Sequence, residues 1–181
     1  EPVAVATHID IDFPYLGGRQ RVKRGLMEAT FDGPGEPWTL FIIHLKSRWT
    51  DRADDPQSAL RREREARALR DFIRKQFPMT QRPRYLIAGD LNDHPASPAV
   101  RRFTRIGDAR PARVIPAADS RGERWTFHYF REDRYERVDY LMASEALWHR
   151  VINRTGHICD VLPQSLTGSD HRLIYADLHL K

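Results

Sequence analysis

The segment "YLIAGDLN" (residues 85–92) decides the fold, because an apolar run typical of a buried strand leads directly into an aspartate and an asparagine. A second apolar run, "WTLFIIHLK" (residues 38–46), lies upstream and is typical of a strand buried on both sides. A stretch of helical period separates the two runs. A strand, a helix and a strand in this order predict an α/β layered fold.

The stretch between the two runs predicts one long helix, from about Pro56 to Phe77, with arginine and glutamate on its outer face. Pro56 suits the first helical turn, and Asp55 is expected to cap it. A short helix is expected at 97–104, and loops at 8–21 and 107–124. Further strands are expected at 3–7, 21–31, 125–130, 138–142, 157–161 and 173–180. No repeat or linker interrupts the chain, so residues 1–181 are expected to form one domain.

The composition is that of a soluble globular chain. Of its 181 residues, 40% are hydrophobic and 30% charged, and no apolar stretch approaches the ~20 residues needed to span a bilayer. The single cysteine, Cys159, excludes an intrachain disulfide, and the sequence assigns no compartment. The net charge of +5, carried largely by arginine, favours an anionic partner. A compositional bias on a solvated face explains the charge equally well.

Six polar residues interrupt or follow the predicted strands. Because ligands of open α/β sheets gather beyond strand ends, these residues are predicted to converge on one site. They are His44, Asp90, Asn92, Asp139, Asp170 and His171.

Each of these residues also has a simpler structural explanation. A lone histidine in a strand is usually structural, Asp-x-Asn after glycine can be a plain turn, and Asp139 can pair with Arg137 or Arg124. These structural explanations are less convincing for the six residues taken together, because a buried carboxylate is costly without a partner or a metal. Oxygen and imidazole ligands without thiolates suit Mg²⁺, Mn²⁺ or Ca²⁺. The set therefore predicts metal-assisted attack of water on a phosphate ester.

Several short motifs, in this order, resemble those of the endonuclease/exonuclease/phosphatase superfamily, which includes deoxyribonuclease I. The motifs are "KRG" (23–25), "HLKS" (44–47), "GDLN" (89–92), "WTFHYF" (125–130), "RVDY" (137–140) and "SDH" (169–171). The resemblance implies a four-layer α/β sandwich of the deoxyribonuclease I type, with two mixed sheets flanked by helices. It places the site at one end of the sheets.

The resemblance also implies roles for individual residues. Asp90 would orient or deprotonate the attacking water, and Asn92 would hold the water or the phosphate. Asp170, together with Asp90, would bind the metal, Mg²⁺ or else Mn²⁺ or Ca²⁺.

The phosphate is expected to meet two histidines. His171, oriented by Asp139, and His44 would contact the scissile group. The remaining expected substrate contacts are Arg24, Lys46, Arg48 and Trp125.

The family's N-terminal half, with a strand-end asparagine and the glutamate that is its principal metal ligand, has no counterpart here. We therefore expect an incomplete sandwich with exposed apolar surface, completed by a missing N-terminal segment or a second copy. The expected function is a divalent-metal-dependent, nuclease-like phosphodiester hydrolase, because arginine suits a polyanion. The alternatives are a phosphoinositide or sphingomyelin-type phosphoesterase, and a non-catalytic fragment or binding module without the primary metal ligand.

Overall fold

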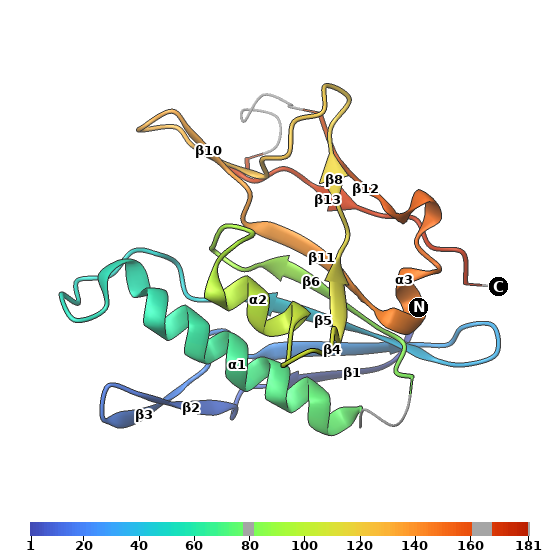
Figure 1. Cartoon of the computed structure of the whole chain (residues 1–181), viewed down its shortest axis with the longest axis horizontal. Helices are drawn as coiled ribbons and strands as arrows, with labels where there is room; N and C mark the ends of the chain where they lie inside the picture. The colour runs from blue at the N-terminus through green and yellow to red at the C-terminus, as the bar shows by residue number, and fades with distance from the viewer. Residues whose placement is uncertain (78–81, 161–167, 181) are drawn as a thin grey trace.

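The computed structural model describes residues 1–77, 82–160 and 168–180. Its centre is a six-stranded sheet with the order β1-β4-β5-β6-β11-β7 (Figure 1). β5 and β6 are parallel, and all other neighbours in this sheet are antiparallel. The strands are β1 (Pro2–His8), β4 (Leu26–Phe31), β5 (Trp38–His44), β6 (Tyr85–Asp90), β11 (Asp139–Ser144) and β7 (Ala112–Val114).

Two helices cover one face of this sheet, α1 (Ala59–Gln76) and α2 (Pro98–Thr104) (Figure 1). The predicted long helix is confirmed, although its first turn is the 3-10 helix η1 (Pro56–Ser58). The carboxylate of Asp55 accepts the N–H groups of Leu60 (2.8 Å) and Arg61 (3.0 Å), so it does satisfy the start of α1. The predicted helix at 97–104 is also confirmed as α2.

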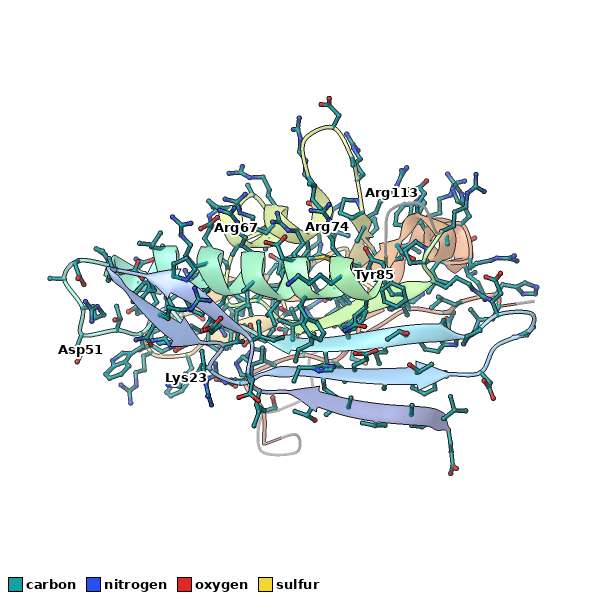
Figure 2. The ribbon with its side chains drawn as sticks, turned by 90° about the horizontal axis from the view of Figure 1, so that it is seen from below. Lys23, Asp51, Arg67, Arg74, Tyr85 and Arg113 are labelled. Atoms are coloured by element: carbon teal, nitrogen blue, oxygen red, sulfur yellow. The ribbon has the colours of Figure 1, made fainter. Side chains whose placement is uncertain are left out.

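The inner face of α1 carries charges that the sequence pattern does not reveal. The prediction that arginine and glutamate fill the outer face does not hold for Arg62 and Glu65, which are buried. Both are partnered: the Arg62 Nε lies 3.1 Å from Oδ2 of Asp93, and Glu65 accepts backbone N–H groups. The outer face carries the exposed Arg67 and Arg74 (Figure 2). Helical periodicity identifies a buried face but not the partners that allow charge on it.

Among the described residues, the opposite face of the sheet is covered mainly over β6 and β11, and Trp38 at the start of β5 packs at the edge of the same apolar cluster. There Leu86 and Leu141 pack with Leu147 of α3 (Glu145–Trp148) and with the C-terminal segment that includes Leu178. The chain after β7 also forms a small three-stranded sheet, with the order β13-β12-β8, and the 3-10 helix η2 (Ile152–Arg154). Its strands are β8 (Ala117–Ala118), β12 (Gly156–Ile158) and β13 (Ile174–Tyr175).

Over β4 and β5 the same face is open. Met27 and Ile42 are register partners on it and are 42% and 39% exposed. The prediction that 38–46 is buried on both sides is therefore wrong, because α1 covers one side and nothing among the described residues buries these two side chains. The expected exposed apolar surface is present here. The four-layer sandwich remains a prediction, since the second sheet of the described chain is small.

Two hairpins complete the described chain. β2 (Asp12–Tyr15) and β3 (Gly18–Arg21) pair where a loop was predicted, joined by Leu16 and Gly17 at positive φ. Alternation of exposed and buried residues in β2 puts Phe13 in the core, a pattern obscured in sequence by the neighbouring proline and glycines. The second hairpin, β9 (Phe127–Tyr129) and β10 (Arg134–Glu136), projects from the body (Figure 1).

The other predicted strands are confirmed with different lengths. β1 and β11 are longer than the predicted 3–7 and 138–142, and β4, β9, β12 and β13 are shorter than predicted. The loop predicted at 107–124 contains β7 and β8. Val161, the last residue of the strand predicted at 157–161, lies outside the described residues. None of the helices in the described ranges has the length and apolar character required to cross a bilayer.

Candidate active site

Strand register brings three of the predicted residues into one row. His44 at the end of β5 pairs with Asp90 at the end of β6, and Asp90 pairs with Asp139 at the start of β11. Laterally paired residues point to the same face of a sheet, so the three side chains lie together on the face opposite α1. The His44 Nε2 lies 3.4 Å from Oδ2 of Asp90.

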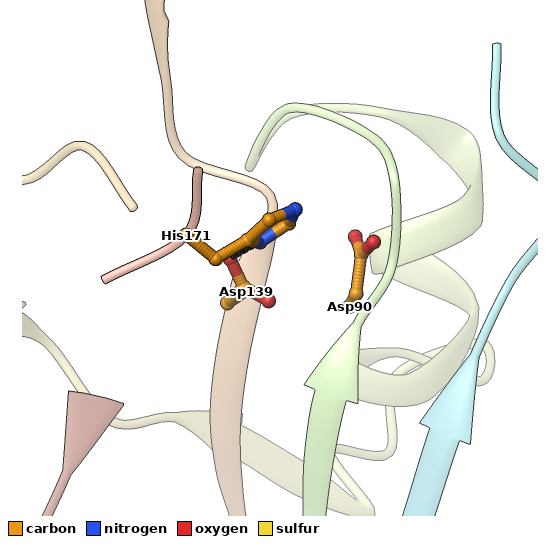
Figure 3. A group of neighbouring side chains, drawn as sticks. All are labelled: Asp90, Asp139 and His171. Atoms are coloured by element: carbon orange, nitrogen blue, oxygen red, sulfur yellow. Dashed lines mark hydrogen bonds and ion pairs between the residues drawn. The ribbon is translucent and has the colours of Figure 1, made fainter. Parts of the chain in front are cut away.

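His171 joins this row from the segment before β13. Its Nδ1 lies 2.8 Å from Oδ2 of Asp139, and its backbone forms a bridge with Phe127 of β9. Ligand atoms of Asp90, Asp139 and His171 all lie within 4.8 Å of one another (Figure 3). Residues that are far apart in the sequence therefore form one compact group at the end of the sheet.

Asn92 lies directly beside Asp90 in a tight turn. Its backbone N–H donates to Oδ1 of Asp90 (2.7 Å), and its Nδ2 donates to Oδ2 (2.8 Å) and to the carbonyl of Leu45 (3.1 Å). Asn92 has a φ of 51°, which asparagine tolerates better than most residues. The turn explanation of "GDLN" is thus correct, and the turn also fixes the Asp90 carboxylate next to the Asn92 amide.

Gly89 allows β6 to approach β5 closely before this turn. It has a φ of 136°, and a Cβ there would lie 1.9 Å from the carbonyl oxygen of Ile43. Only glycine permits this backbone approach, which places Asp90 beside His44.

The environment shifts the pKa values of the acidic and basic groups. Burial, together with the charge of Asp139, raises the pKa of Asp90 to about 6. The hydrogen bond that the His171 ring donates to Asp139 raises the pKa of His171, whereas burial and the charge of Arg24 lower the pKa of His44. The site thus pairs a carboxylate whose pKa is raised toward neutrality with an imidazole that holds its proton more tightly than usual.

Two of the predicted substrate contacts lie at this site. Arg24 donates to the carbonyl of Leu45 (3.0 Å), and its charge acts on His44. Arg48 donates to the carbonyl of Asn92 (3.2 Å) and pairs with Glu136 of β10 (2.6 Å). Arg48 thus connects the loop after β5 to the turn and to the projecting hairpin.

The structure does not bring three other predicted residues to the group. The Lys46 ammonium is buried against the carbonyl oxygens of Ser47 and Trp49. The Trp125 indole donates to Glu123 and lies under the guanidinium of Arg172, which is 4.2 Å from its ring centroid. Asp170 is exposed and outside the cluster of metal-ligand candidates found among the described residues. The roles of Lys46, Trp125 and Asp170 remain predictions.

Sequence reasoning missed two residues that position the site. The buried Glu65 accepts the N–H groups of Lys46 (2.8 Å) and Lys23 (3.4 Å), which ties α1 to the chain beside His44 and Arg24. Thr126 Oγ1 accepts the N–H groups of Val138 and Asp139, both at 3.1 Å, and so fixes the start of β11. The polar side chain of Thr126 inside an aromatic run could have indicated a positioning role. Nothing in the sequence distinguishes Glu65 from the other charged residues of its helix.

The donor set is suited to a hard divalent cation. Asp90 and Asp139 are paired across two strands, and the charge of Asp139 raises the pKa of Asp90. A cation between such carboxylates relieves their repulsion, and oxygen ligands are those that Mg²⁺ and Mn²⁺ prefer. The residues present therefore fit a divalent ion.

Comparison with known proteins agrees with this arrangement. The sequence profile described as "Endonuclease/Exonuclease/phosphatase family" matches residues 3–171, and the chain belongs to this family. No curated protein matches the sequence.

Three solved structures show the same fold at low sequence identity. An endonuclease/exonuclease/phosphatase from Bacteroides vulgatus has a TM-score of 0.64 and 18% identity, covering 100% of this chain and 66% of that one. The human Nocturnin catalytic domain with bound sulfate has a TM-score of 0.64 and 15% identity, covering 100% of this chain and 60% of that one. Sphingomyelinase C from Streptomyces griseocarneus has a TM-score of 0.57 and 16% identity, covering 98% of this chain and 61% of that one.

These matches confirm the predicted α/β fold of the deoxyribonuclease I type. The chain spans 60–66% of the length of these three structures.

Proposed function

We propose that this chain carries the catalytic site of a divalent-metal-dependent phosphodiester hydrolase that acts on nucleic acid. The observation that carries the proposal is the convergence of Asp90, Asp139 and His171 within 4.8 Å, with Asn92 bonded to Asp90. This is a proton acceptor and a proton donor side by side, the pair that hydrolysis of a phosphate ester requires.

Asp90 is the proposed base. Its carboxylate is half-buried, has a pKa raised to about 6 in the metal-free chain, and is held by two hydrogen bonds from Asn92. A base with a pKa near the working pH accepts a proton from water effectively. The Asn92 amide would hold the same water in line with the phosphorus.

His171 is the proposed acid or electrostatic stabiliser. Asp139 binds its Nδ1 at 2.8 Å and raises its pKa, so the Nε2–H is directed away from Asp139 and available to a phosphoryl or leaving oxygen. His44 and Arg24 would contact the remaining phosphoryl oxygens, and both lie at the same edge of the sheet.

Asp90 and Asp139 are the residues that would hold the metal. A divalent ion bound there would supply positive charge to the phosphoryl oxygens. Members of this family generally use divalent metals, which supports Mg²⁺ or Mn²⁺ as the cofactor.

A nucleic-acid substrate is favoured over a lipid by charge. The chain has a net charge of +5, and the loop at 46–52 carries Arg48 and Arg52 around Trp49, which is 80% exposed. The second candidate is a phospholipid phosphodiesterase, favoured by the similarity to a sphingomyelinase C.

The test is hydrolysis of plasmid DNA and of bis(4-nitrophenyl) phosphate with Mg²⁺ or Mn²⁺, against EDTA. We expect metal-dependent cleavage that falls by about 10²–10⁴-fold in His171→Ala. Activity that persists in EDTA or in His171→Ala contradicts the proposal, and hydrolysis of sphingomyelin without cleavage of DNA favours the second candidate.

Metal binding is tested separately, without activity. Millimolar Mg²⁺ is expected to raise the melting temperature of the chain, and Asp90→Asn is expected to reduce that shift. Equal shifts in the two proteins would exclude Asp90 as a ligand. Absence of a shift in the unaltered chain would favour the alternative of a non-catalytic binding module.

A further inference from the structure

The β9–β10 hairpin carries a row of aromatic side chains that begins at the candidate active site. The ring of Phe127 lies 4.9 Å from that of His171, Tyr129 lies 6.5 Å from Phe127, and Phe130 lies 6.4 Å from Tyr129, between centroids. Phe130, in the turn that follows β9, is 62% exposed. We call Phe127, Tyr129 and Phe130 the aromatic row; the hairpin that bears it projects from the body of the molecule (Figure 1).

Phe127 and Tyr129 of the aromatic row lie on the face of the hairpin that contacts the site, and Phe130 follows them in the turn after β9. Register places Phe127 opposite Glu136 and Tyr129 opposite Arg134, so these side chains share one face. On that face Glu136 pairs with Arg48 at 2.6 Å, and Arg48 also donates to the turn after β6. A substrate bound at the site therefore has the inner end of the row beside it.

The hairpin is held in place before any ligand binds. His128 stacks on Tyr135 at 4.2 Å with the rings 3° from parallel, and binds Asp133 at 3.0 Å. The Arg134 guanidinium lies 5.5 Å from the ring of Tyr129. A pre-organised surface loses less conformational entropy on binding, so exposed rings on it are effective contacts.

We infer that the aromatic row stacks on unpaired bases next to the scissile phosphate, so that the substrate is single-stranded nucleic acid. This inference rests on the proposed function. Base–aromatic stacking is tolerant of sequence, since every base has a π-face, and contributes about 1–3 kcal/mol per base. A small phosphate ester bound at His171 would not extend to Phe130.

The charges at the end of the hairpin favour nucleic acid over a membrane. Residues 131–134 are all charged, and burying charged side chains in a bilayer is costly. Within the described chain Glu132 pairs with Arg134 and Asp133 pairs with His128, whereas Arg131 makes no ion pair. Arg131 is thus available to a phosphate of the same strand.

The test measures binding of a fluorescein-labelled 12-nucleotide single strand by anisotropy, in EDTA to prevent cleavage. Phe130→Ala is expected to raise Kd by about 5- to 150-fold, the factor equivalent to 1–3 kcal/mol. Phe130→Trp should keep the affinity, and Phe130→Leu should lose it, because leucine is apolar but cannot stack. Arg131→Gln should reduce the salt slope of log Kd by about one.

Tyr175→Ala is the matched control, because Tyr175 is an exposed aromatic residue on β13 outside the aromatic row. Its affinity for the single strand should equal that of the unaltered chain. An unchanged Kd in Phe130→Ala, or full affinity in Phe130→Leu, would overturn the inference. So would loss of binding to phosphatidylcholine–sphingomyelin vesicles in Phe130→Ala with oligonucleotide binding unaffected.

Hydrolysis of bis(4-nitrophenyl) phosphate separates this inference from the proposed function. That substrate has no bases, so Phe130→Ala should hydrolyse it at the unaltered rate. If Phe130→Ala hydrolyses this substrate normally and also keeps its oligonucleotide affinity, only the stacking inference is refuted. If the unaltered chain does not hydrolyse the substrate, the result argues against the proposed function.

Discussion

Oδ2 of Asp139, the first residue of β11, lies 2.8 Å from Nδ1 of His171, which lies three positions before the start of β13. The two are 32 positions apart in the chain, and the hydrogen bond joins the central sheet to the small second sheet at the candidate active site. This bond determines both the orientation of the imidazole and the direction of its pKa shift.

Asp139→Asn is expected to lower the pKa of His171 while leaving the fold intact, because the amide keeps the shape but loses the charge. The histidine pKa values are measured by NMR titration. In the unaltered chain His171 should titrate above the ordinary value of 6.5 and His44 below it. The hydrolysis rate should fall more than about tenfold in the variant. An unchanged His171 pKa would contradict the pairing.

The raised pKa of His171 also affects stability. A histidine that binds its proton more tightly in the folded state stabilises the fold below the unfolded pKa of 6.5, and this contribution is lost as the pH rises through the folded pKa. The Asp139→Asn variant should therefore lose more stability at pH 5.5 than at pH 9, as measured by urea unfolding.

Asp90→Asn should make the chain inactive and more stable at pH 7.5 without metal. The Asp90 pKa is raised from 3.8 to about 6, so ionised Asp90 destabilises the folded state progressively as the pH rises from 3.8 to 6. Removing that charge should increase the free energy of unfolding by about 3 kcal/mol at pH 7.5 in EDTA. The gain should be much smaller at pH 4, and a gain of equal size at both pH values would refute this account.

Arg62→Ala should be strongly destabilising. Arg62 is 2% exposed and its Nε lies 3.1 Å from Asp93, so its removal leaves a buried carboxylate without its partner, at a cost of about 3–5 kcal/mol. Arg67→Ala on the outer face of α1 is the control, since its pair with Asp71 is exposed, and should change stability by less than about 0.5 kcal/mol. Similar losses in urea unfolding for both variants would contradict the burial argument.

Gly89→Ala should destabilise the chain by at least about 2 kcal/mol, because its Cβ would lie 1.9 Å from the Ile43 carbonyl oxygen at a φ of 136°. Gly18→Ala is the control: the nearest atom to its Cβ would be 3.9 Å away, at an ordinary contact distance. Thermal unfolding should separate the two variants clearly. A Gly89→Ala chain as stable as Gly18→Ala would show that β5 and β6 can separate without cost.

Much of the fold could be predicted from local patterns. Apolar runs of strand length and the helical period between them predicted β5, α1 and β6, and the strands that pair with them followed from the same alternation. The β2–β3 hairpin was missed because its proline and glycines resemble a loop, and the open face of β5 was missed because an apolar run does not show whether another layer covers it.

The sequence by itself determined which residue types are available at the strand ends, since His44, Asp90, Asn92, Asp139 and His171 were all identifiable from short motifs. Only the tertiary structure decided which of them meet, because strand register sets lateral neighbours, and β5, β6 and β11 are joined by long connections rather than by tight turns that would fix the register locally. The tertiary structure also brought Arg24 and Arg48 to the site. It directed the Lys46 ammonium away from the site, to the Ser47 carbonyl oxygen in the same loop. The side chains that position the site, Glu65 and Thr126, act through backbone N–H groups distant in the chain, and only folding creates those contacts.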